Sequence, residues 1–138
     1  MSENAKFDAM KVIFDFNFIE EKDHIIDRYR IYADGSKHYI EHQKITSVDK
    51  KEHIETSDME IEDIKQVEKF LKDITKAIRL WRGNYTNAAS NALWYSQQGY
   101  SWRLRMNTKK VVQYFGKDHK PKNFDEVLEI IRKMFERG

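Results

Sequence analysis

The sequence predicts an α+β fold, in which an antiparallel sheet carries two amphipathic helices on one face. Segments with apolar residues at every second position, the period of strands, lie before and after one long helical pattern. Hairpin turns separate these segments, and two further segments repeat apolar residues at the helical spacings of three and four. Strands grouped in hairpins favour antiparallel pairing over a parallel sheet. We therefore expect about five to seven strands in two hairpin or meander groups, with helices at about residues 58–82 and 124–136.

Three strands and a weaker fourth are expected before the long helix. Residues 12–19 alternate between two sets of side chains, which is typical of a half-buried strand. The other segments are residues 25–33, residues 37–45 and the less regular residues 51–55. The fourth strand would pair beyond a turn at residues 48–50.

An Asp-Gly pair at residues 34–35 predicts a tight hairpin between the second and third strands. The two central residues of a type I′ turn need positive φ, which Asp and Gly tolerate. This turn places Tyr29 opposite Ile40 on one face of the hairpin. On the other face it places Arg28 opposite Glu41, a surface pair of opposite charge.

The long helix is expected at about residues 58–82. Ser57 and Glu60 have the spacing of a capping box, in which each side chain satisfies a backbone N–H near the other residue. Gly83 lies at the position where a residue that caps the C-terminus of this helix is expected. One apolar stripe follows the segment, formed by Ile61, Ile64, Val67, Leu71, Ile74, Ile78 and Trp81.

Beyond the long helix, a polar stretch at residues 84–91 is expected to form a loop. Short turns then separate strands expected at residues 93–96, 100–106 and 110–115. The last helix is expected at residues 124–136, with Asn123 as its cap and Glu126 three residues further on.

The composition suits one globular domain that spans residues 1–138, since 40% of the residues are apolar and 35% are charged. The sequence has no cysteine, which excludes disulfides, thiolate metal sites and a cysteine nucleophile. The first seven residues lack the apolar stretch of a signal peptide, and no apolar run approaches the roughly 20 residues that a membrane helix needs. We therefore expect a cytoplasmic protein that does not engage a membrane.

The charges are distributed unevenly along the chain. Residues 1–76 carry a net charge of −5, whereas residues 77–138 carry +7. No acidic residue lies between Asp73 and Asp118, and that interval contains eight Lys and Arg residues. Such a block favours an anionic partner. The alternative is that part of the interval is buried strand, where acids are rare.

Aromatic, basic and amide side chains gather in this same interval, since all three tryptophans lie between residues 81 and 102. Flat rings stack on bases, guanidinium groups bind phosphate oxygens, and amides recognise base edges. We therefore expect a ligand site in which Trp81, Trp94 and Tyr95 stack, Arg82, Arg103 and Arg105 hold phosphates, and Asn87 and Asn91 recognise polar edges. The alternative is that Trp81 and Trp102 are core residues and that the arginines lie on a solvated sheet face.

The leading hypothesis is a non-enzymatic binding protein whose partner is a small anionic, nucleotide-type ligand. The alternative is a protein–protein module, an inhibitor or immunity-type protein that binds an acidic partner, because Trp, Tyr and Arg also dominate interfaces. An enzyme is the third hypothesis, since the known phosphate-loop and nucleophile-elbow motifs are absent. We expect no cofactor, and duplex nucleic acid is disfavoured because no helix carries a basic stripe. An aromatic-rich surface also favours a homo-oligomer.

The histidines do not predict a metal site. His38 and His42 have the spacing of a helical chelate, but both are expected in one strand, where four residues span roughly 13 Å. That distance is too long for one ion, so no metal is expected.

The C-terminal third of the chain resembles the ending of a group of small bacterial proteins. The residues that carry the resemblance are Trp102, Leu104, Gly116, Pro121 and the run from Asn123 to Leu128. The resemblance implies a hairpin, a proline turn and a capped helix. It implies no activity and no site residue.

Overall fold

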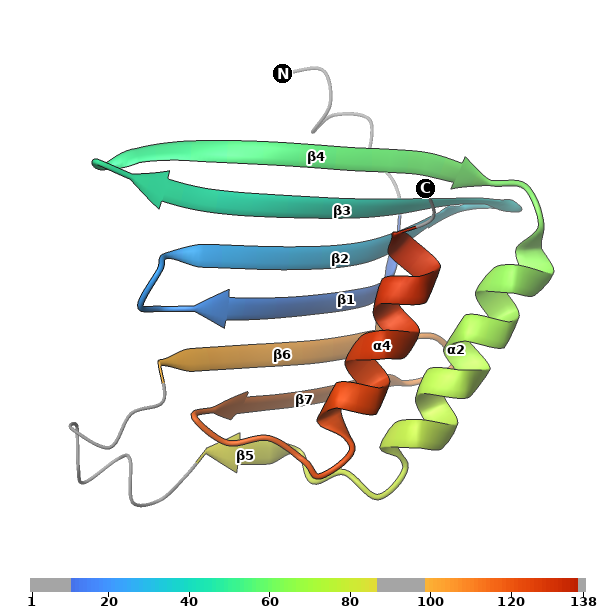
Figure 1. The fold of residues 1–138 in the computed structure, drawn as a ribbon. Helices are drawn as coiled ribbons and strands as arrows, with labels where there is room; N and C mark the ends of the chain where they lie inside the picture. The colour runs from blue at the N-terminus through green and yellow to red at the C-terminus, as the bar shows by residue number, and fades with distance from the viewer. Residues whose placement is uncertain (1–10, 87–98, 137–138) are drawn as a thin grey trace.

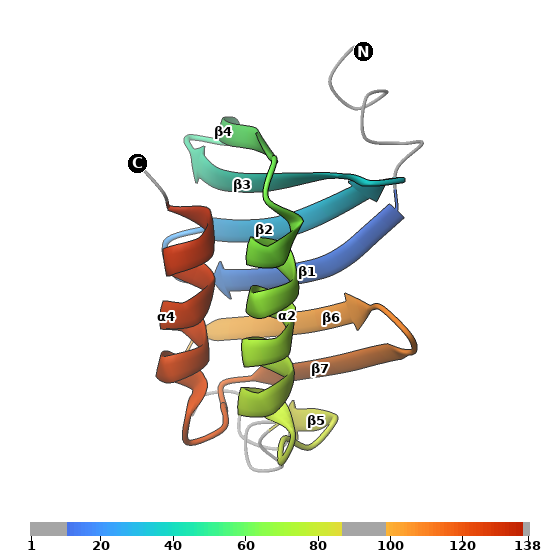
Figure 2. The same cartoon turned by 90° about the vertical axis from the view of Figure 1, so that its right-hand side faces the viewer.

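The computed structural model describes residues 11–86 and 99–136. They form one sheet with two helices, α2 (Ile64–Ile78) and α4 (Phe124–Phe135), side by side on one of its faces (Figure 1, Figure 2). The helices run across the strands, so that each covers several of them (Figure 1). This α+β architecture confirms the fold class that the sequence predicts.

The sheet has seven strands, of which six pair antiparallel and one short strand joins an edge in parallel. The strands are β1 (Lys11–Glu20), β2 (Ile25–Asp34), β3 (Lys37–Val48), β4 (Lys51–Ile61), β5 (Asn84–Thr86), β6 (Tyr100–Asn107) and β7 (Val111–Lys117). Their order across the sheet is β4-β3-β2-β1-β6-β7-β5. The meander from β1 to β4 and the hairpin of β6 and β7 meet where β1 pairs with β6.

The β2–β3 hairpin turns at residues 35–36, one position later than predicted. Gly35 has φ +62°, and type II′ turns select glycine at this first central position. Every predicted pair of this hairpin is therefore displaced by two residues along β3. Glu41 lies opposite Arg30, not opposite Arg28.

β4 is longer than the predicted fourth strand and takes the place of the start of the predicted long helix. All eleven of its residues pair with β3. Ser57 and Glu60, the predicted capping box, therefore belong to a strand. The helix begins instead after Asp63, whose side chain accepts the Lys65 backbone N–H at 3.0 Å. Continuous cross-strand pairing outweighs the local capping preference here.

α2 ends at Ile78, so the predicted end near residue 82 is wrong. The Trp81 backbone N–H donates to the Ile78 carbonyl at 2.9 Å in a tight final turn. Arg79, not Gly83, is the C-cap residue. The buried side chains of α2 include Phe70, which lies outside the predicted stripe.

α4 begins where the sequence predicts, but Asn123 has a different role from the expected one. Its side chain makes no capping hydrogen bond to α4. Its amide oxygen accepts the Trp81 indole N–H at 2.6 Å, and its amide nitrogen donates to the Ala77 carbonyl at 2.8 Å. Asn123 therefore joins the start of α4 to the end of α2.

The predicted loop at residues 84–91 begins with a short strand, β5, which pairs in parallel with β7. The strand expected at residues 93–96 lies outside the described residues. The strands expected at residues 100–106 and 110–115 correspond to β6 and β7.

The core lies between the sheet and the two helices. The ring centroids of Phe14 on β1 and Phe70 on α2 are 4.9 Å apart, and those of Trp102 on β6 and Phe124 on α4 are 5.1 Å apart. Burying an apolar side chain of this size stabilises the fold by about 2–3 kcal/mol. The helix side of the sheet is thus used for packing, which leaves the opposite face for another role.

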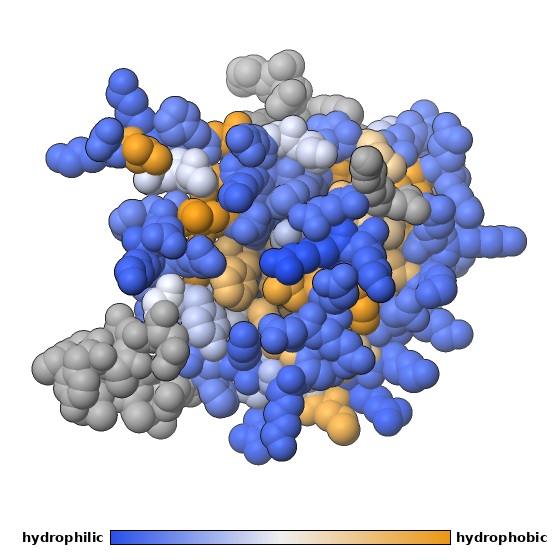
Figure 3. Space-filling model, viewed as in Figure 1, coloured by the Kyte–Doolittle hydropathy of each residue, from blue (hydrophilic) through white to orange (hydrophobic). Residues whose placement is uncertain are grey.

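The outer surfaces of the helices are mostly hydrophilic when the molecule is viewed from the helix side (Figure 3). Both helices turn their buried apolar residues towards the sheet. Neither helix of the described residues is long and apolar enough to span a membrane.

Candidate functional site

The face of the sheet that the helices leave uncovered carries an ordered polar cluster. On β1, Phe14 and Phe16 belong to the core, so the alternating residues Asp15 and Asn17 point to the opposite face. The same alternation places two arginines of β2 and two of β6 on that face. We call this cluster the arginine face. Its six residues are Asp15, Asn17, Arg28, Arg30, Arg103 and Arg105.

Two rows of side chains cross the three strands of the arginine face. In one row, Asp15 lies between Arg30 and Arg105. In the other row, Asn17 lies between Arg28 and Arg103. Neighbouring strands are about 4.8 Å apart, so the arginines of β2 and those of β6 form columns about 10 Å apart. The two arginines within each column are about 7 Å apart.

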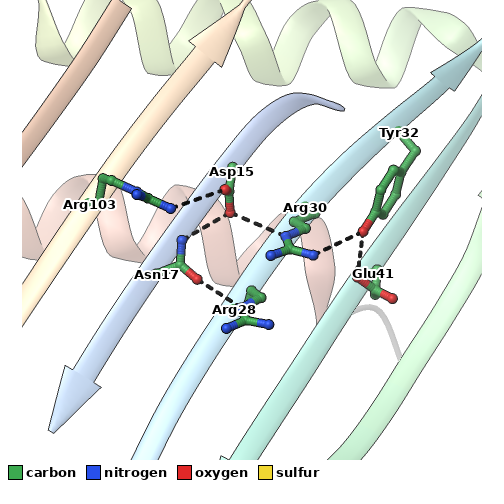
Figure 4. A network of polar contacts seen from close by, with 7 residues as sticks. All are labelled: Asp15, Asn17, Arg28, Arg30, Tyr32, Glu41 and Arg103. Carbon is green, nitrogen blue, oxygen red and sulfur yellow. Dashed lines mark hydrogen bonds and ion pairs between the residues drawn. The ribbon is translucent and has the colours of Figure 1, made fainter. Parts of the chain in front are cut away.

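The two central residues hold three of these arginines in place (Figure 4). Asp15 Oδ1 lies 3.5 Å from Arg30 Nε, and Asp15 Oδ2 lies 3.8 Å from Arg103 Nη2. The Asn17 amide nitrogen donates to Asp15 at 3.0 Å, and its oxygen accepts from Arg28 Nε at 3.0 Å. Arg105 forms no ion pair with any described residue. The four guanidinium groups therefore surround Asp15, and Glu41 lies opposite Arg30 as a second carboxylate.

A buried polar pair on β2 and β3 supports this array (Figure 4). The Tyr32 hydroxyl donates to Glu41 Oε1 at 2.9 Å and accepts from Arg30 Nη1 at 3.3 Å. Glu41 is only 6% exposed. Burial raises the pKa of Tyr32 above its ordinary value, and the charge of Glu41 adds to the rise. Tyr32 therefore remains a neutral hydroxyl that fixes the position of Arg30.

A row of isoleucines borders the arginine face on the same surface of the sheet. Ile19 pairs with Ile26 between β1 and β2, and Ile26 pairs with Ile45 between β2 and β3. Ile54 continues the row on β4 and is 54% exposed. On each strand, this apolar row lies two residues from the row that contains Asn17, Arg28 and Arg103. The surface thus offers cationic and apolar contacts side by side.

A second cationic region lies at one end of the helix layer. A cleft of about 1130 Å³ opens between the end of α2, the segment that leads to β5 and the segment that precedes α4. We call it the end cleft. Its cations are Lys76, Arg79, Arg82, Lys120 and Lys122, and its acids are Asp73 and Glu126. Among these cations, only Lys120 forms an ion pair with a described residue, at 3.5 Å from Asp125.

Trp81 lines the end cleft but belongs to the core. It is 9% exposed, and its ring stacks on Phe124 with a centroid distance of 6.2 Å and an interplanar angle of 16°. Trp102 is also buried and meets the Trp81 ring edge-on at 5.4 Å. Both tryptophans are therefore core residues, as the alternative interpretation of the sequence has it. Little of the Trp81 ring remains for stacking on a ligand.

The predicted site residues do not share one surface. Arg103 and Arg105 lie on the arginine face, whereas Trp81 and Arg82 lie at the end cleft on the helix side. The other predicted residues, Asn87, Asn91, Trp94 and Tyr95, lie outside the described residues. The predicted site is thus divided between two cationic regions.

Four residues of the arginine face were missing from the predicted site, namely Asp15, Asn17, Arg28 and Arg30. Their alternation along β1 and β2 is visible in the sequence and marks them as one polar strand face. Their neighbours on β6 are not visible there, because the pairing of β1 with β6 joins residues 80 to 92 positions apart. That pairing brings β2 and β6 to the two sides of β1.

The described residues contain no group of three or more His, Asp or Glu side chains placed to hold a metal ion. No protein-family model matches the chain, and no curated protein or solved structure matches it. Function is therefore inferred from the geometry of the two cationic regions.

Proposed function

We propose that this protein is a non-enzymatic binding protein that captures a small phosphate-bearing, nucleotide-type ligand on the arginine face. The observation that carries the proposal is the array of four guanidinium groups around Asp15, only one of which also lies opposite Glu41. Both helices of the described residues pack on the opposite face of the sheet (Figure 1). We assign no reaction to it, because its carboxylate is engaged by two arginines.

The charge and the geometry of the array suit phosphate groups. Guanidinium groups bind phosphate oxygens through paired N–H donors. The two arginines of each column are about 7 Å apart, and the columns on β2 and β6 are about 10 Å apart. This spacing suits two phosphates, or one polyphosphate that lies across β1. The Arg103 side chain is 51% exposed and Arg105 is exposed, so both can reach a ligand.

The polar contacts of the array also support binding rather than only solvation. Arg28 and Arg30 are partly buried and are held by hydrogen bonds with Asn17 and Tyr32. Holding a binding group in place reduces the entropy that is lost on association. The neighbouring Ile19 and Ile26 provide an apolar surface for the face of a base or a sugar.

The test is a calorimetric titration of the purified chain with ATP, AMP and inorganic pyrophosphate. The variant Arg103→Ala/Arg105→Ala removes the two most exposed guanidinium groups of the array. The matched control, Arg79→Ala/Arg82→Ala, removes two exposed guanidinium groups from the end cleft. Circular dichroism and thermal melting check that both variants fold.

We expect the arginine-face variant to lose at least about a hundredfold in affinity, since each charged hydrogen bond contributes about 1.5–3 kcal/mol. The end-cleft variant should bind within about twofold of the wild type, and rising salt should weaken binding to the wild type. Equal loss in both variants, or loss only in the end-cleft variant, would contradict the assignment to the arginine face. No binding of any probe by the wild type would contradict the function itself.

A second candidate function is capture of an acidic partner protein by the same face. The isoleucine row favours it, because exposed apolar side chains beside arginines are typical of protein interfaces. A salt-sensitive complex with an acidic protein, formed by a chain that binds none of the three small probes, would favour this function over the first.

A further inference from the structure

β4 is a long and regular edge strand. Its outer side pairs with no other strand among the described residues, and it forms one edge of the sheet (Figure 1). Ten of its eleven residues are exposed. Its pairing with β3 runs without a register shift from Lys51 to Ile61, so no bulge interrupts it. A row of backbone N–H and C=O groups therefore faces outward along the strand.

Most proteins protect such an edge. The usual devices are a short strand, a proline, a bulge, a covering loop or charged side chains, lysine above all. β4 contains neither proline nor bulge, and its charges are four acids and one lysine, which repel an acidic strand but not a basic one. The strand is therefore open to pairing with another extended chain, the mode of recognition called β-augmentation.

The charges of β4 indicate what kind of strand it accepts. Its acids are Glu52, Glu55, Asp58 and Glu60, against the single cation Lys51. A second copy of β4 would bring the same acids against these, which costs free energy because like charges opposite each other repel. A basic strand would instead place its cations beside these carboxylates.

Two apolar side chains on β4 also lie free for contact. Ile54 is 54% exposed and Met59 is 43% exposed. They are an odd number of residues apart, so they lie on opposite faces of the sheet. An added strand with alternating side chains could therefore bury one apolar residue on each face.

We propose that β4 is a docking edge for a basic, extended peptide segment of another protein, which adds an eighth strand to the sheet. Backbone hydrogen bonds would supply the affinity, and the four acids would select basic partners. This proposal does not depend on the arginine face, because β3 lies between β4 and β2, the nearest strand of that face.

The probe is a synthetic peptide of about eight residues that alternates lysine and valine and is blocked at both ends. Two control peptides accompany it: one has glutamate in place of lysine, and one has methyl groups on alternate backbone nitrogens. Amide NMR signals and amide hydrogen exchange of the full chain report where each peptide binds.

We expect the basic peptide to shift the β4 signals and to slow exchange of the outward-facing β4 amides. Both control peptides should have no such effect. Equal shifts from the methylated peptide would mean that backbone pairing is not involved, which would overturn the proposal. It would also be overturned by shifts outside β4, or by β4 amides that are already protected without peptide, since a second copy or another segment would then hold the edge.

A charge-reversal variant tests the choice of partner. Glu55→Lys/Asp58→Lys should weaken binding of the basic peptide by at least about tenfold and allow the acidic peptide to bind. The matched control, Glu68→Lys/Glu129→Lys, changes the net charge equally on the exposed surfaces of α2 and α4. Equal weakening in both variants would mean that net charge alone attracts the peptide, and the edge site would be wrong. The variant Arg103→Ala/Arg105→Ala should bind the peptide like the wild type, which separates this test from that of the proposed function.

Discussion

The arginine face and the end cleft are both rich in cations, but they hold them differently. On the arginine face, Asp15, Asn17 and Tyr32 contact three of the four arginines. At the end cleft, four of the five cations contact no carboxylate of the described residues. One region is an array of hydrogen-bonded arginines on paired strands, and the other is a cleft whose cations, apart from Lys120, form no ion pair with a described residue. A count of cations therefore does not identify a binding site, because the positions in which the cations are held decide how much entropy binding costs.

The two regions also differ in the kind of side-chain packing that supports them. The end cleft rests on aromatic packing, in which Trp81 contacts Phe124 and Trp102. The arginine face rests on buried polar groups, since Asn17 and Glu41 are less than a tenth exposed. Mutations should therefore act on the two regions through different forces.

The largest effect is expected at Gly116, which lies under the wall of the end cleft. A Cβ atom there would lie 2.5 Å from the His119 carbonyl oxygen and 2.5 Å from Trp102 Nε1. Gly116→Ala should therefore lower the free energy of unfolding by about 3 kcal/mol, measured by urea denaturation. Gly83→Ala is the control, because the nearest atom would be 3.9 Å away. Equal stability of the two variants would show that the wall is not tightly packed.

The next effect is expected at the centre of the arginine face. Asp15→Ala removes the carboxylate that faces four guanidinium groups, so it should cost about 2 kcal/mol at low salt. Added salt should restore part of the loss, because it screens the repulsion between the arginines. The control, Asp73→Ala, breaks only an exposed helical pair with Lys69 and should cost about 0.5 kcal/mol or less. A loss at Asp15 that salt does not change would contradict the electrostatic account.

A smaller effect is expected at Tyr32. Tyr32→Phe removes the donor to Glu41 and should cost about 1 kcal/mol at neutral pH. Because the pKa of Tyr32 is raised, its hydroxyl contributes its full stabilisation to the fold below the ordinary tyrosine pKa. This contribution is lost as the pH rises through the raised pKa. The stability of the wild type should therefore fall more steeply in alkali than that of Tyr32→Phe. Thermal melting of both proteins across the alkaline range measures this difference. Parallel plots of melting temperature against pH would contradict a contribution of the Tyr32 hydroxyl to the pH dependence.

The smallest effect is expected at Arg79 in the end cleft. Arg79 is exposed and forms no ion pair with any described residue. Arg79→Ala should change the free energy of unfolding by no more than about 0.5 kcal/mol. A larger loss would show that the cations of the end cleft are held in place after all, and the contrast between the two regions would fail.

Strand alternation and helical spacing predicted the architecture, because the core residues of β1, β6 and α4 follow the two periods closely. Local sequence signals such as the capping box were less reliable for the ends of helices and strands. Ser57 and Glu60 suit a helix cap, yet their segment pairs with β3 over its whole length, and local spacing cannot reveal that long-range pairing. The shared face of Arg103 and Arg105 also followed from alternation, but the rest of the arginine face depended on the order of the strands, which alternation does not determine.

The most direct test of the central claim is to observe the arginine side chains themselves. NMR resolves the Nε–H signals of individual arginines, and ATP can be added to the wild-type chain while these signals are followed. The claim predicts shifts at Arg28, Arg30, Arg103 and Arg105, with the signals of Arg79 and Arg82 unchanged. Shifts at Arg79 and Arg82, with the four signals of the arginine face unchanged, would contradict it and would move the ligand to the end cleft.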